Sequence, residues 1–202
     1  MAVGLALGLA ARVSAGDFSL TAEERERVES REVVVVAALD STQRRGVVRG
    51  AVLIDAQPAT VFELLTSCAE AVQYVPHLRV CRVRERAPDN SWLVAEHEID
   101  FGWYAPRVRY TFRADLTADQ SIDFRQVSGD FKLNEGRWLL EPVAEGAHTL
   151  LLYHATIDPP GFVPNWLARS TYRRELPQML TDLRKRCEAK DRSRAVTGAS
   201  AR

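Results

Sequence analysis

The sequence predicts an α+β domain, in which a seven-stranded antiparallel sheet is followed by a long C-terminal helix, over about residues 47–187 of the 202. The patterns run in the order of one strand, two short helices, six further strands and one long helix. Residues 107–115 alternate between polar and apolar side chains throughout. Such alternation indicates one buried face and one solvated face, which is typical of an antiparallel sheet.

Prolines and polar turns mark where these elements begin and end. The first strand covers residues 47–55, and Pro58 opens the first helix, since proline suits the first helical turn. The second helix begins near Ala69 and stops before Pro76. The long helix should run from Phe162 to about Cys187, and Pro177 should kink it or divide it. The six later strands are expected at about residues 80–86, 92–101, 107–115, 121–127, 131–141 and 148–157.

The segments that flank this domain differ from it in composition. Residues 1–15 contain a short apolar run and end in Val13-Ser14-Ala15, which resembles a cleaved secretory signal, although no basic residue precedes the run. This favours a periplasmic or secreted protein; the alternatives are an uncleaved anchor and a disordered cytoplasmic leader. Residues 16–46 form an extension with a short helix and a strand. Residues 188–202 are polar and small, and we expect a disordered tail.

Charge and cysteine content exclude several classes of function. The 27 basic and 27 acidic residues balance, which argues against nucleic-acid binding, because such domains carry a basic excess. The cysteines, at positions 68, 81 and 187, fit no zinc pattern, and the four histidines are scattered, so no metal or cofactor is expected. We expect buried free thiols; if the protein is exported, a Cys68–Cys81 disulfide is the alternative. We also expect a monomer.

Three stretches of the chain resemble the START/Bet v 1-like (SRPBCC) superfamily, in its polyketide cyclase and coenzyme-Q-binding branch. They are residues 52–65 (VLIDAQPATVFELL), residues 74–78 (YVPHL), and the run from Gly129 to Lys132 with Gly136, Trp138 and residues 140–142. The resemblance implies a helix-grip fold, in which the sheet curves around the C-terminal helix and a hydrophobic ligand lies between them. It says little about which ligand, because this fold carries many functions.

Candidate ligand-binding residues follow from which side chains would face that space. His97 shares the apolar face of its strand, so it should point inward and bind a ligand carbonyl or hydroxyl; the alternative is a core histidine paired with the backbone. Asn134 is in step with Trp138 and would also point inward, unless a bulge near Gly136 turns it outward. Aromatic side chains supply the walls, or alternatively fill a core: Tyr110, Phe112, Phe124, Trp138, Tyr153, Phe162 and Trp166.

The sequence favours binding over catalysis. No nucleophile with an orienting base is visible, and the inner face lacks a second, partnered titratable group beside His97. We therefore expect binding or transfer of a lipid-like, isoprenoid or quinone-like molecule without turnover; the alternative is a polyketide cyclase/aromatase-type enzyme. The aromatic turn at residues 102–106 and the arginines of the last helix predict a transient membrane contact, unless the turn's rings fold back on the sheet.

Overall fold

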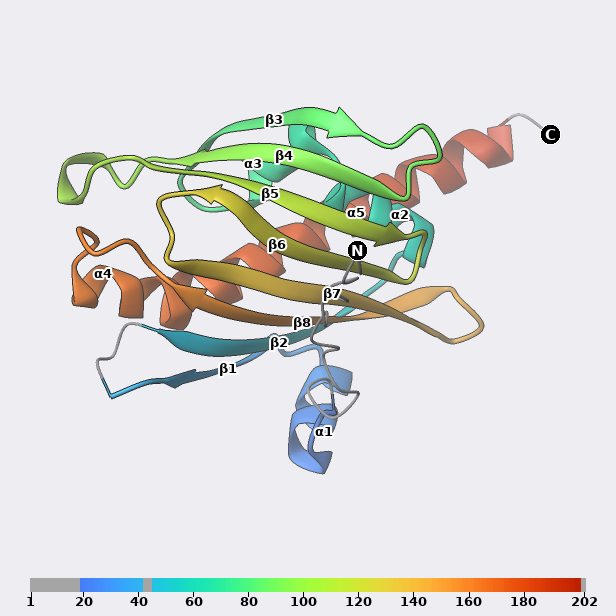
Figure 1. Cartoon of the computed structure of the whole chain (residues 1–202). Helices are drawn as coiled ribbons and strands as arrows, with labels where there is room; N and C mark the ends of the chain where they lie inside the picture. The colour runs from blue at the N-terminus through green and yellow to red at the C-terminus, as the bar shows by residue number, and fades with distance from the viewer. Residues whose placement is uncertain (1–18, 42–44, 201–202) are drawn as a thin grey trace, which may run out of the picture.

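The computed structural model describes residues 19–41 and 45–200, so the predicted signal segment at residues 1–15 lies outside the described residues. One eight-stranded antiparallel sheet curves around a long C-terminal helix (Figure 1). Within the described residues, no helix has the length and apolar character that crossing a bilayer requires. The strands are β1 (Val34–Leu39), β2 (Gly46–Ile54), β3 (Leu78–Arg86), β4 (Trp92–Ile99), β5 (Val108–Thr117), β6 (Ser121–Gly129), β7 (Leu133–Val143) and β8 (His148–Asp158).

The strand order of the sheet is β1-β2-β8-β7-β6-β5-β4-β3, so β1 and β3 are its two edges. Strands β3 to β7 each pair with the next strand along the chain, and β8 pairs on its other side with β2. Helices α2 (Pro58–Leu65) and α3 (Cys68–Tyr74) connect β2 to β3 across the sheet. The predicted α+β helix-grip fold is confirmed.

The strand predicted in the N-terminal extension joins the sheet as an eighth strand, beside the seven predicted for the domain. Strand β1 pairs with β2 over six residues in unbroken register. It is preceded by α1 (Ala22–Glu29), whose first turn is closed by a capping box between Thr21 and Glu24. Val28 of this helix packs with Val34, Leu150 and Leu152. The extension is therefore part of the sheet.

The C-terminal helical region is divided where Pro177 requires it. Helix α4 (Asn165–Ser170) is followed by the π-helical turn η3 (Thr171–Glu175) and then by α5 (Leu176–Ser200). Pro177 has no N–H to donate, and its ring would clash with the carbonyl four residues earlier in a regular helix. The Leu176 N–H instead bonds to the Thr171 carbonyl, which adds one residue to that turn.

Helix α5 closes the core against the concave face of the sheet. Leu180, Leu183 and Cys187 are fully buried there and pack with Val48 and Val52 of β2. Each such aliphatic side chain contributes about 1.5–3 kcal/mol by leaving water. The helix therefore forms one wall of whatever space the curved sheet leaves open.

The structure differs from the disordered tail expected at residues 188–202, because α5 continues to Ser200. Polar contacts hold this extra length against α2. Lys190 Nζ lies 2.7 Å from Glu63 Oε1, and Arg194 pairs with the same carboxylate. The Thr60 hydroxyl donates to Asp191 at 2.6 Å. The polar composition of residues 188–202 could not predict these contacts, since their partners lie about 130 residues earlier in the chain.

Candidate functional site: an apolar cavity under the sheet

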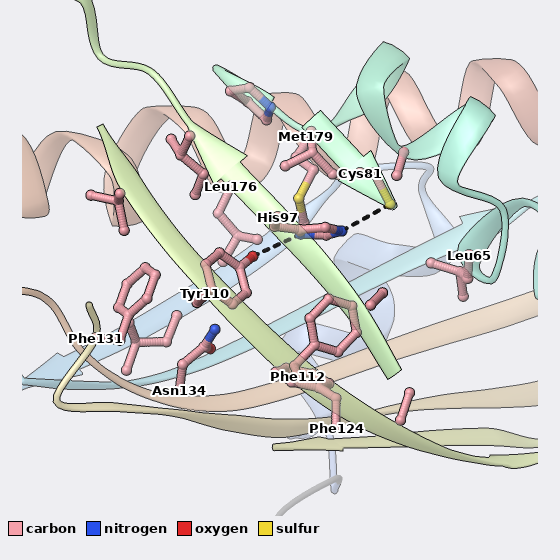
Figure 2. Close-up of a pocket in the computed structure, with 18 of the residues that line it drawn as sticks. Leu65, Cys81, His97, Tyr110, Phe112, Phe124, Phe131, Asn134, Leu176 and Met179 are labelled. Carbon is pink, nitrogen blue, oxygen red and sulfur yellow. Dashed lines mark hydrogen bonds between the residues drawn. The ribbon is translucent and has the colours of Figure 1, made fainter. Parts of the chain in front are cut away.

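A cavity of about 270 Å³ lies between the concave face of the sheet, helices α2 and α3, and the α4–α5 segment (Figure 2). Its walls are mainly aliphatic and aromatic, as in most small-molecule sites, and its volume is close to the lower end of the roughly 300–1,000 Å³ usual for them. Seven of the nine predicted site residues line it: His97, Tyr110, Phe112, Phe124, Asn134, Trp138 and Tyr153.

Strand alternation brings these side chains together. His97 of β4 stands opposite Tyr110 of β5, and the next pair on the same face of the sheet is Ala95 with Phe112. Trp138 of β7 stands opposite Tyr153 of β8, and their ring centroids are 4.2 Å apart. Alternate residues of a strand face the same side of the sheet. These side chains all line the cavity, so the prediction that they point inward is confirmed.

The prediction that Phe162 and Trp166 belong to the cavity wall is wrong, since neither side chain lines the cavity. They are 45% and 51% exposed. Phe162 precedes α4, and the face that α4 buries carries Leu167 and Ala168 instead. The extra residue in η3 lies between these positions and Leu176, so an α-helical period projected back from α5 does not identify the buried face of α4.

Three side chains form a polar chain in the cavity wall. His97 Nδ1 lies 2.9 Å from Tyr110 Oη, and His97 Nε2 lies 3.2 Å from Cys81 Sγ. Burial lowers the pKa of His97 to about 4 and raises the pKa of the Tyr110 phenol well above its usual value. Both groups are therefore neutral at pH 7, and they can offer hydrogen bonds but no charge.

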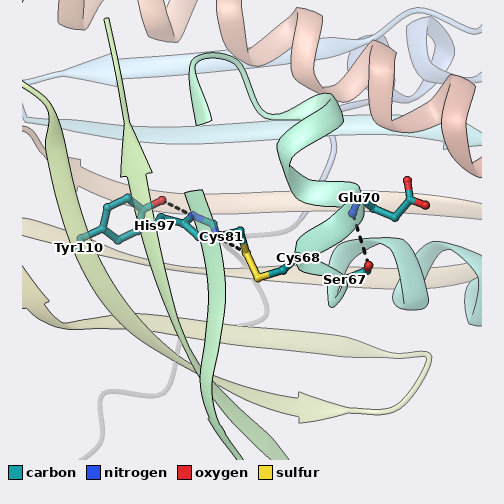
Figure 3. The surroundings of a disulfide bond; sticks show 6 residues. All are labelled: Ser67, Cys68, Glu70, Cys81, His97 and Tyr110. Carbon is teal, nitrogen blue, oxygen red and sulfur yellow. Dashed lines mark hydrogen bonds between the residues drawn. A yellow bond between two sulfur atoms is a disulfide. The ribbon is translucent and has the colours of Figure 1, made fainter. Parts of the chain in front are cut away.

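Cys81 is joined to Cys68 by a disulfide, which corrects the expectation of free thiols at these positions (Figure 3). Packing of α3 against β3 brings the two Cα atoms to 5.1 Å, within the range that a disulfide spans. Both cysteines line the cavity. Cys187 keeps a buried free thiol, and burial raises its pKa to about 12.

Asn134 points into the cavity, which decides between the two alternatives that the sequence left open (Figure 2). Strand β7 pairs with β8 without a register shift from Leu133 to Val143, so no bulge interrupts it at Gly136. The Asn134 side chain is buried, with 8% of the residue exposed. Within the described part of the chain, its carboxamide has no hydrogen-bond partner.

Sequence reasoning missed the cavity residues that come from loops and helix ends. Glu175 of η3 lines the cavity, where its carboxylate accepts from the Thr171 hydroxyl at 3.2 Å and lies 3.6 Å from His77 Nε2. Phe131, in the β6–β7 connection, packs edge-on against Tyr110. Of these features, only the disulfide could have been anticipated from the sequence, because its two cysteines are visible there. Within the described residues, no group of three His, Cys, Asp or Glu side chains is placed to hold a metal ion.

A curved antiparallel sheet that grips a C-terminal helix over an apolar cavity defines a helix-grip domain with an internal cavity. A family model described as "Polyketide cyclase / dehydrase and lipid transport" matches residues 54–184, and the chain belongs to this family. No curated protein matches the chain.

Solved structures with the same fold come from both branches of that description. A STAR-related lipid transfer protein of Xanthomonas axonopodis is 16% identical, with a TM-score of 0.64, covering 77% of this chain and 93% of its own. The Zhui aromatase/cyclase of a Streptomyces species is 16% identical, with a TM-score of 0.59 and coverages of 71% and 94%. A START superfamily protein of Mycobacterium smegmatis is 20% identical, with a TM-score of 0.57 and coverages of 71% and 97%.

Proposed function

We propose that this protein binds one hydrophobic small molecule in the cavity reversibly and without converting it, as a carrier of a lipid-like, isoprenoid or quinone-like compound. The observation that carries the proposal is an apolar cavity whose central polar pair, His97 and Tyr110, is neutral at pH 7. Such a pair can orient a ligand through hydrogen bonds.

The cyclase/aromatase alternative needs groups that move protons, and the central pair of the cavity, His97 and Tyr110, supplies them poorly. A general base works best when its pKa is near the working pH, and the His97 pKa of about 4 makes it a weak base at pH 7. The Tyr110 phenol, with its raised pKa, is a weak acid. The chemistry of the site therefore favours binding over turnover.

Export to the periplasm or outside the cell remains part of this proposal. Disulfides persist in oxidising compartments and are rare in the cytosol, so the Cys68–Cys81 bridge supports it. N-terminal sequencing of the protein from its host would test it; soluble mature protein that still begins at Met1 would contradict it.

Transfer also requires an approach to the membrane that holds the ligand. One end of the cavity, which we call the α4 end, is lined by Val108, Val163 and Ala168. These three side chains pack together with Ala105. Three large apolar side chains are exposed in the segments that form this end: Trp103 at 87%, with Phe162 and Trp166. Arg173 and Arg174 are exposed in the next turn. Aromatic rings beside cations suit a bilayer interface, and a transient contact there is part of the proposal.

One experiment distinguishes the carrier from the enzyme. Native mass spectrometry of the purified protein should reveal a copurified hydrophobic molecule, and incubation of that molecule with excess protein should return it unchanged. Chemical conversion that disappears in His97→Leu would overturn the carrier and support the cyclase.

A matched pair of variants tests whether the cavity is the site. Ala95 lines the cavity, while Val94 is the adjacent residue of β4 and does not line it. Ala95→Phe should fill the cavity and weaken binding of the neutral dye phenylnaphthylamine at least tenfold, and Val94→Phe should bind it as the wild type does. Equal binding by both folded variants would show that the dye binds elsewhere.

A further inference from the structure

The disulfide fixes which hydrogen bonds remain available to a ligand. A disulfide sulfur carries no hydrogen, so the hydrogen bond between Cys81 and His97 requires that Nε2 carries the proton and donates it. In the neutral imidazole, Nδ1 is then an acceptor and takes the hydroxyl hydrogen of Tyr110. The Tyr110 oxygen is left with lone pairs and no hydrogen to give, so it can only accept from a ligand.

Asn134 supplies the complementary group. Figure 2 shows its carboxamide directed toward Tyr110, against which Phe131 packs edge-on. The residue is 8% exposed, and its carboxamide has no hydrogen-bond partner among the described residues. Buried polar side chains are nearly always paired, so an amide that meets no described protein group and opens into the cavity supports a ligand atom as its partner.

The described residues that line the cavity offer no positive charge to neutralise an anionic ligand. No Arg or Lys is among the described residues that line it, and the lining carboxylate, Glu175, already accepts from Thr171. A carboxylate or phosphate placed inside would lose its hydration without gaining a counter-ion, which is strongly unfavourable. Free fatty acids and phospholipid headgroups are therefore poor occupants of this site.

We propose that the cavity selects an uncharged hydrophobic alcohol or phenol, whose hydroxyl donates to Tyr110 Oη and accepts from Asn134 Nδ2. This inference rests on the proposed carrier function and adds the chemical class of the ligand. A ketone of the same shape would keep the bond from Asn134 and lose the bond to Tyr110. A hydrocarbon would lose both.

The test compares four naphthalenes of similar size that differ in one group: naphthylethanol, the naphthyl methyl ketone, ethylnaphthalene and naphthoate. Each displaces phenylnaphthylamine from the full chain, with its disulfide intact, at pH 8. We expect the alcohol to bind about two- to tenfold more tightly than the ketone, and the ketone more tightly than the hydrocarbon by a similar factor, which is the usual effect of one neutral hydrogen bond. Naphthoate should bind most weakly.

Variants assign the two bonds. Tyr110→Phe should lower the affinity for the alcohol to that for the ketone. Asn134→Leu should lower the affinity for the ketone to that for the hydrocarbon, and should leave the alcohol tighter than both by its one remaining bond to Tyr110. Thr111→Val, which removes a hydroxyl from the neighbour of Tyr110 on β5 that does not line the cavity, should preserve the wild-type order.

The wild-type series decides the inference even if a variant fails to fold. An alcohol that binds no more tightly than the ketone, or naphthoate as the tightest ligand, would overturn the inference and leave the carrier function standing. If no member of the series displaces the dye and the dye itself does not bind, the carrier function fails.

Discussion

Acid should destabilise this protein more than its carboxylates alone would explain, because His97 is held neutral inside the fold. Burial lowers its pKa from 6.5 to about 4, so between these values the unfolded chain binds a proton that the folded chain does not. Stability from this group is therefore fully present above pH 6.5 and is lost as the pH falls toward 4. The loss is about 2 kcal/mol between pH 7 and pH 5, and about 3 kcal/mol by pH 4.

The measurement is urea unfolding of the wild type and of His97→Gln at pH 7, 6, 5 and 4. Asp and Glu residues titrate in the same range in both proteins, so the difference between the two pH profiles isolates His97. His154→Gln removes a histidine that does not line the cavity, and it should keep the steep wild-type profile. Parallel profiles for the wild type and His97→Gln would refute the reasoning, as would an NMR titration that places the His97 pKa near 6.5.

Two further changes test the frame around the cavity. Replacing both Cys68 and Cys81 by serine should lower the free energy of unfolding by about 3 kcal/mol. The reason is that the bridge joins residues 13 apart and so reduces the entropy of the unfolded chain. An unchanged denaturant midpoint under non-reducing conditions would count against the bridge. Gly136→Ala would place a Cβ 2.2 Å from the His154 carbonyl oxygen and should cost about 1–3 kcal/mol or more, whereas Gly161→Ala meets no atom within 4 Å and should be nearly neutral in thermal unfolding; equal melting temperatures for the two variants would contradict the packing described here.

The face of the sheet to which a strand residue points was predictable from the sequence, because side chains alternate between the two faces along a strand. His97 and Tyr110 sit in strands whose alternation is regular, and both face the cavity as expected. Asn134 was ambiguous, since one inserted residue at Gly136 would have reversed it, and only the unbroken β7–β8 register settled its direction.

Contacts between distant segments were not predictable in the same way. The disulfide depends on how α3 packs against β3, which no local pattern encodes. The position of Trp166 depends on the extra residue in η3, because the α-helical period of the buried Leu176, Leu180 and Leu183 does not continue through that turn. The order in the last turns of α5 depends on Glu63, far away in sequence.

The two edges of the sheet would meet a second sheet very differently. Strand β3 carries Arg79, Arg82, Arg84 and Arg86, and its pairing with β4 is irregular at two places. Like charges and bulges both oppose strand-to-strand contact, so this edge is protected against self-association. Strand β1 has no charged residue between Val34 and Leu39, and Val36 is 39% exposed. In concentrated solution, β1 is therefore the edge through which copies of this chain would aggregate, and a lysine at Val36 is the change that would improve solubility.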